Sequence, residues 1–139
     1  MSIYKVIGSA TGFTPDEQAA IQLPVRAAYD NLLRGPGCEE DFHTLAAAVN
    51  VAMICAEKID QLVEISCVAA RDAMMRLHAR HQKLGSWGFD GPAIGQVELA
   101  VDVYEQLTSL LTGGQLKAAM SECIRRMKAG EVMQSGDLA

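Results

Sequence analysis

Residues 38–84 read CEEDFHTLAAAVNVAMICAEKIDQLVEISCVAARDAMMRLHARHQKL and contain neither glycine nor proline. Their apolar residues recur at alternating steps of three and four, which is the spacing of one face of an α-helix. Acidic residues begin the stretch and basic residues end it, as the helix dipole favours. The pattern therefore predicts one long central helix over 38–84.

The predicted helix over 38–84 is longer than a compact domain of this size. A helix of about 45 residues would be about 65 Å long, whereas a compact domain of this size has a radius of gyration of only about 14 Å. Either the helix bends although no glycine or proline marks the bend, or it is a straight spine whose apolar stripes need more cover than one chain supplies. A second apolar stripe runs beside the first, through Val51, Ile54, Leu62, Ile65 and Ala69. We expect the spine, and with it a homodimer.

The segments on either side of 38–84 also have helical patterns. Thr14 and Glu17 form a capping-box sequence at the start of a helix predicted over 14–34, and Pro24 predicts a kink or break within it. Two further helices are expected, over 92–112, ended by Gly113-Gly114, and over 115–129.

The predicted architecture is all-α. It is a single domain over 1–139, formed as a bundle of three to four main helices with one long central helix. We expect residues 1–13 to form an extended arm or a short strand, and 131–139 to form a flexible tail.

Composition limits the classes of function that fit the chain. Its 139 residues carry a net charge of −5, with 50% hydrophobic and 5% aromatic residues. The acidic balance argues against nucleic acid as the main partner, because phosphate contacts need a basic face. No apolar run is long enough to cross a membrane, and the start lacks the features of a secretory signal. These features favour a cytoplasmic protein.

Residues 76–92, RLHARHQKLGSWGFDGP, contain the residues that most resemble a binding site. His78 and His81 share a helix face, but a metal site needs further ligands, and the Glu-x-x-His pattern of di-metal bundles is absent. The glycines match neither a phosphate-binding nor a dinucleotide-binding motif. The sequence therefore predicts no catalytic residue, metal or cofactor.

Trp87 and Phe89 in the same stretch have two interpretations. They fill the corner between two helices, or they are exposed anchors of an interface, since tryptophan is enriched at binding hot spots. In the second interpretation the candidate interface consists of Trp87, Phe89, Val51, Ile54, Leu62 and Ile65.

The segment 115–129 follows a glycine turn and invites comparison with a helix-turn-helix. Its candidate nucleic-acid contacts are Lys117, Arg125, Arg126 and Lys128. A recognition helix usually offers such groups near its start, whereas three of these four lie near the end. A small DNA-binding regulator is thus an alternative function, and a metal-dependent enzyme using His78 and His81 is a second one.

Two stretches, DFHTLAAAVNVAMICAEKI over 41–59 and WGFDGPAIGQVELAVDVYEQL over 87–107, resemble small uncharacterised helical proteins of proteobacterial phages, prophages and plasmids. The resemblance spans about residues 20 to 128 and brings no reaction or ligand with it. It implies an accessory protein of a mobile element that acts by binding a host or phage protein. The expected function is therefore that of a non-enzymatic oligomeric interaction protein, for example an inhibitor of a defence system.

Overall fold

A computed structural model describes residues 12–129 of the chain. Within them it has five helices: α2 (Pro15–Arg34), α3 (Glu39–Ala56), α4 (Gln61–Leu84), α5 (Gly91–Leu110) and α6 (Gly113–Lys128). The predicted all-α class is confirmed. The expected flexible tail over 131–139 lies outside the described residues, as does the expected arm apart from residues 12 and 13. No helix of the described part is both long and apolar enough to cross a membrane.

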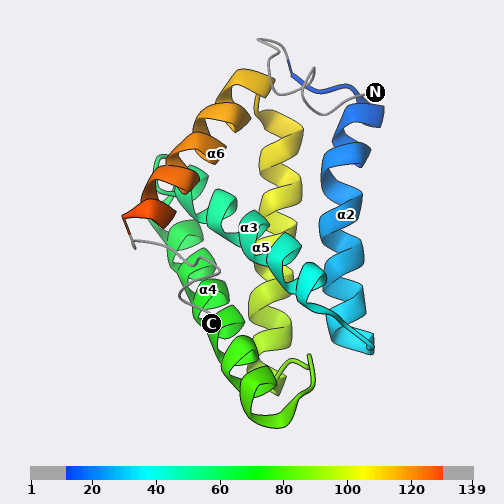
Figure 1. The fold of residues 1–139 in the computed structure, drawn as a ribbon. Coiled ribbons are helices and arrows are strands. Elements are labelled where there is room, and N and C mark those ends of the chain that lie inside the picture. The colour runs from blue at the N-terminus through cyan, green and yellow to red at the C-terminus, as the bar shows by residue number, and fades with distance from the viewer. Residues whose placement is uncertain (1–11, 130–139) are drawn as a thin grey trace.

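The central element is α3, which crosses obliquely over the antiparallel pair α2 and α5 (Figure 1). Helix α4 runs back along α5, and α6 covers the far end of α3 (Figure 1). Because α3 packs against each of the other four helices, twelve of its eighteen residues are buried. Residues 48–56 are buried on every side, which explains why this half of the helix carries apolar residues around most of its circumference.

The prediction of a single helix over 38–84 is wrong, because the chain turns over residues 57–60. The backbone N–H of Asp60 donates to the carbonyl of Ala56 at 3.0 Å, which closes the last turn of α3. The Asp60 carboxylate then accepts from the N–H of Leu62 at 2.7 Å and caps α4. An aspartate cap of this kind starts a new helix without glycine or proline.

This turn removes part of the reason for expecting a homodimer. By folding back, α4 helps to cover the α3 part of the second apolar stripe, so Val51 and Ile54 are only 8% and 3% exposed, whereas Leu62 and Ile65 on α4 remain exposed. A helical hairpin can bury two stripes that a straight rod of the same sequence leaves uncovered. The homodimer stays a prediction, and the buried stripe of α3 no longer supports it.

The start of α2 confirms the predicted capping box. The N–H of Glu17 donates to the Thr14 hydroxyl at 3.2 Å, and the N–H of Thr14 donates to the Glu17 carboxylate at 3.0 Å. Helix α2 continues through Pro24, so the proline does not break the helix.

The junction between α5 and α6 differs from the expected one. Helix α5 ends at Leu110, and Gly113 and Gly114 form the first turn of α6 rather than ending α5. Thr112 caps α6 by accepting from the N–H of Gln115 at 3.1 Å. A threonine cap followed three residues later by glutamine is a capping box, and this signal outweighs that of the two glycines.

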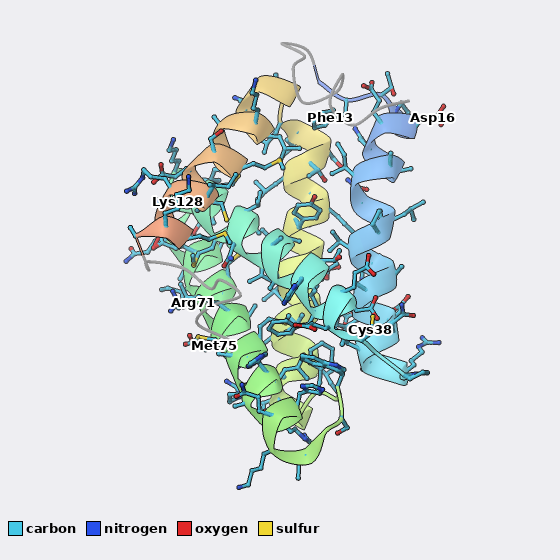
Figure 2. The ribbon with its side chains drawn as sticks, in the orientation of Figure 1. Phe13, Asp16, Cys38, Arg71, Met75 and Lys128 are labelled. Carbon is cyan, nitrogen blue, oxygen red and sulfur yellow. The ribbon has the colours of Figure 1, made fainter. Side chains whose placement is uncertain are left out.

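Residues 12 and 13 attach the start of the described chain to this junction. Gly12 forms an isolated antiparallel backbone bridge with Thr112. Phe13 is 8% exposed and belongs to the core, near the start of α2 and the end of α5 (Figure 2). The expected extended arm therefore ends in a buried anchor at Phe13.

Candidate functional site

An apolar groove of about 590 Å³ lies between α6 and the end of α3. We call it the α6 groove. It is lined by Ile54, Cys55, Lys58, Ile59, Leu111, Gln115, Ala118, Ala119, Glu122 and Arg126. Its floor is buried, whereas Ile59 on its rim is 62% exposed. The volume lies within the range of about 300–1,000 Å³ that is common for ligand pockets.

The groove follows from the turn over residues 57–60 and from small residues on α6. The turn directs Ile59 outward at the end of α3. On the facing side of α6, Ala118 and Ala119 project too little to fill the space between the two elements. Ile59, four residues beyond Cys55, and the two alanines of α6 thus lie on the two sides of the groove.

Ion pairs fix the far end of α6 to the turn between α3 and α4. The guanidinium of Arg126 donates to both carboxylate oxygens of Glu57, at 2.7 Å for the Nη2–Oε2 contact. Its Nε donates to Glu122 at 2.9 Å, and Arg125 donates to the same carboxylate at 2.8 Å. These hydrogen bonds from Arg125 and Arg126 lower the pKa of Glu122 to about 2. The network holds one end of the groove in a defined shape.

This end of the groove is positively charged although the chain is acidic. Its charged side chains are Lys58, Glu122 and Arg126 of the lining, with their ion-pair partners Glu57 and Arg125. Three cations and two carboxylates give a local net charge of +1, against −5 for the whole chain. Lys58 is exposed and forms no ion pair with any residue from 12 to 129. The groove therefore combines an apolar floor with a cationic end.

These ion pairs involve two of the four candidate nucleic-acid contacts. Arg125 and Arg126 bind carboxylates of their own chain. Lys117 and Lys128 are exposed near opposite ends of α6, and Lys128 lies on the outer side of the bundle (Figure 2). The four residues thus do not present the basic stripe along one helix face that DNA contact needs.

The candidate interface residues do not gather on one surface. Val51 is buried in the core, and Ile54 forms part of the groove floor. Leu62 and Ile65 are 74% and 57% exposed near the start of α4. Trp87 lies beyond the end of the same helix, which is about 36 Å long at 1.5 Å per residue.

Trp87 and Phe89 pack mainly on their own chain. The Trp87 ring stacks on His81, with centroids 3.7 Å apart and ring planes 7° apart, and lies 5.2 Å from the Phe42 ring. The Phe89 ring lies 5.7 Å from that of Tyr29. Both are partly buried against the core. They fill the corner between α4 and α5, which is the first of the two interpretations.

All three histidines gather at this corner, which no spacing in the sequence indicated. The rings of His43 and His78 lie 5.8 and 5.5 Å from the ring of Phe42, and His81 stacks on Trp87. Burial, followed by the neighbouring charge of His81, lowers the pKa of His78. Within residues 12–129, no three His, Cys, Asp or Glu side chains are arranged to hold a metal ion.

We expect the protein to lose stability as the pH falls from about 7 to about 5. The unfolded His78 side chain titrates near pH 6.5, whereas its pKa in the folded protein is lower. Between these two pKa values the unfolded chain binds more protons than the folded protein does, so the free energy of unfolding decreases as the pH is lowered. Below the folded pKa this group causes no further loss.

Urea denaturation at pH 7.5, 6.5, 5.5 and 5.0 measures this dependence. His78→Gln, which has no imidazole at position 78, should show a shallower slope over that range than the wild type. Equal slopes for the two proteins would contradict the role given to His78.

The four cysteines are free thiols, of which Cys38 is exposed and the other three are buried. Burial raises the pKa of Cys55 on the groove floor and of Cys123 on α6. Burial, with a smaller contribution from nearby Cys55, raises the pKa of Cys67 to about 11. Thiols with raised pKa values are poor nucleophiles, so the groove floor acts as an apolar surface.

Sequence reasoning did not predict the groove, although it named two of its lining residues, Ile54 and Arg126, for different roles. Only the turn over residues 57–60 brings them to one site. No protein-family model, curated protein or solved structure matches this chain.

Proposed function

We propose that this chain is a non-enzymatic interaction protein. Its α6 groove binds a short apolar segment of a partner protein that carries acidic residues at one end. The observation that carries the proposal is the apolar floor beside a cationic end of net charge +1.

The apolar part of the proposal rests on surface that remains open to solvent. Ile59 is 62% exposed at the rim, and Ala118 faces it across the groove. Covering about 200 Å² of apolar surface, counted on the groove and on the bound segment together, contributes about 5 kcal/mol before the costs of association. This gain suits a short segment that binds reversibly rather than an obligate subunit.

The charged part of the proposal rests on Lys58. Its ammonium group is available, whereas Arg126 is held by Glu57 and Glu122. An acidic residue placed near Lys58 would favour encounter and fix the direction of the bound segment. Screening at high salt would weaken this part of the interaction.

The resemblance to small helical proteins of phages, prophages and plasmids suggests where the partner comes from. In that setting the partner is a host or phage protein, for example a component of a defence system, and the complex forms in the cytoplasm.

A display library of random 12-residue peptides, selected on the full chain, tests the proposal. We expect enriched peptides to carry at least two apolar residues and an acidic residue at one end. Ala118→Arg should weaken them at least tenfold, or about 1.4 kcal/mol, because the new side chain enters the groove. Ala118 is exposed and helical, so the fold should tolerate arginine, which a melting curve checks.

Ala27→Arg is the matched control, since Ala27 is exposed on α2 and does not line the groove. It adds the same charge and should leave the affinity within about twofold. Lys58→Gln should weaken the acidic peptides and reduce their salt dependence. Failure to enrich any peptide would refute the proposal, as would peptides that bind Ala118→Arg as tightly as the wild type.

A further inference from the structure

We infer that residues 1–11 of the same chain occupy the α6 groove until a partner displaces them. This inference rests on the proposed function, because it concerns the regulation of the same groove. It is carried by the bridge at Gly12, the length of the preceding segment and its sequence.

The backbone bridge gives the segment its direction. Gly12 pairs with Thr112 in the antiparallel sense. In an antiparallel pair, the residues before one partner run beside the residues after the other. The chain that precedes Gly12 therefore leaves the bridge on the side where α6 begins, at one end of the groove, while Phe13 lies in the core. Leu111 lies beside the bridge and lines the groove.

The length of the segment matches that of the groove. From Thr112 to Arg126, α6 rises about 21 Å at 1.5 Å per residue. An extended chain advances about 3.3 Å per residue, so six residues before Gly12 cover about 20 Å and reach Val6. Residues 6–11 can therefore span the groove, and residues 1–5 extend beyond it.

The sequence of the segment also fits the groove. Gly8, Ser9 and Ala10 are small and would pass the first half of α6, between Gln115 and Glu122. The apolar pair Val6-Ile7 would reach the end where Ile59 is exposed.

Lys5 would add a positive charge to an end that already carries +1. An acidic partner would therefore bind better per contact than this segment does. A short tether gives an effective concentration of the order of millimolar, so even weak contacts keep the segment in place until such a partner arrives.

Photo-crosslinking in the full chain tests this inference. The photoreactive residue p-benzoyl-L-phenylalanine replaces Ala118 in one variant, and Ile59 in a second in case the first does not fold. A third variant carries it at Ala47, which is exposed on α3 and does not line the groove. After irradiation and trypsin digestion, mass spectrometry should find cross-links to residues 1–5 or 6–26 from the groove positions and not from position 47.

Mixing ¹⁵N-labelled with unlabelled chains before irradiation separates contacts within a chain from contacts between copies. Cross-links within one isotope class support the inference. Cross-links mainly between classes would overturn it in favour of exchange between two copies, and the absence of any groove-specific cross-link would overturn it outright.

A second experiment separates this inference from the proposed function. Val6→Asp/Ile7→Asp should abolish the cross-link and raise the affinity of the library peptides at least threefold. Ser2→Asp/Ile3→Asp adds the same charge outside the groove and should do neither. If groove-dependent peptides bind both variants and the wild type equally, the inference fails and the proposed function stands. If the cross-link forms but no peptide binds, the proposed function and the displacement by a partner fail, and only the position of residues 1–11 in the groove stands.

Discussion

Replacing Phe42 with alanine is expected to lower the free energy of unfolding by about 3–5 kcal/mol, as for other fully buried phenylalanines. The side chain is 0% exposed near the start of α3. Its ring contacts Trp87 and His78 at centroid distances of 5.2 and 5.5 Å. Truncation opens a cavity where α3, α4 and the residues after α4 meet, and rings held on several sides cannot easily collapse into it.

Urea denaturation followed by far-UV circular dichroism measures this loss, and the single tryptophan gives a local signal from the same corner. Phe42→Leu keeps much of the volume and should lose clearly less. Leu84→Ala, at a position that is 63% exposed, should stay within about 0.5 kcal/mol of the wild type. A Phe42→Ala loss below about 1 kcal/mol would show that this corner is not packed as described.

Replacing Ala52 with leucine is expected to destabilise the protein by about 1–3 kcal/mol, the usual cost of adding volume to a close-packed core. Ala52 is 0% exposed in the middle of α3, which packs against all four other helices. Leucine and alanine have similar helix propensities, so the loss would report packing around α3 rather than the stability of the helix itself.

Ala47→Leu is the control for this substitution, because Ala47 is exposed on the same helix. It should change the free energy of unfolding by less than about 0.5 kcal/mol. Equal effects at positions 47 and 52 would contradict the central position of α3, since a peripheral helix would accept leucine at either site.

Most helix ends were predictable from a few neighbouring residues. Thr14 and Glu17 begin α2 as expected, and Gly85 ends α4 with a φ of 76°. These signals are reliable because a cap depends on hydrogen bonds and backbone angles within one turn. The start of α6 was misplaced because the capping box at Thr112 and Gln115 was overlooked in favour of the adjacent glycines.

The break over residues 57–60 was not predictable from neighbouring residues. The apolar spacing from 38 to 84 is the same for one long helix and for two helices in a hairpin, and Asp60 is acceptable in either. The α6 groove and the histidine corner follow from that choice, so they were not predictable either.

The amino-acid order was therefore sufficient for the helical class and most helix boundaries, because these depend on interactions between neighbours along the chain. The hairpin, the groove and the placement of Ile54 and Trp87 depend on contacts between distant segments. The hairpin is favoured because it lets four helices bury α3 at once, and that gain in hydrophobic burial exceeds what a straight helix of the same residues obtains.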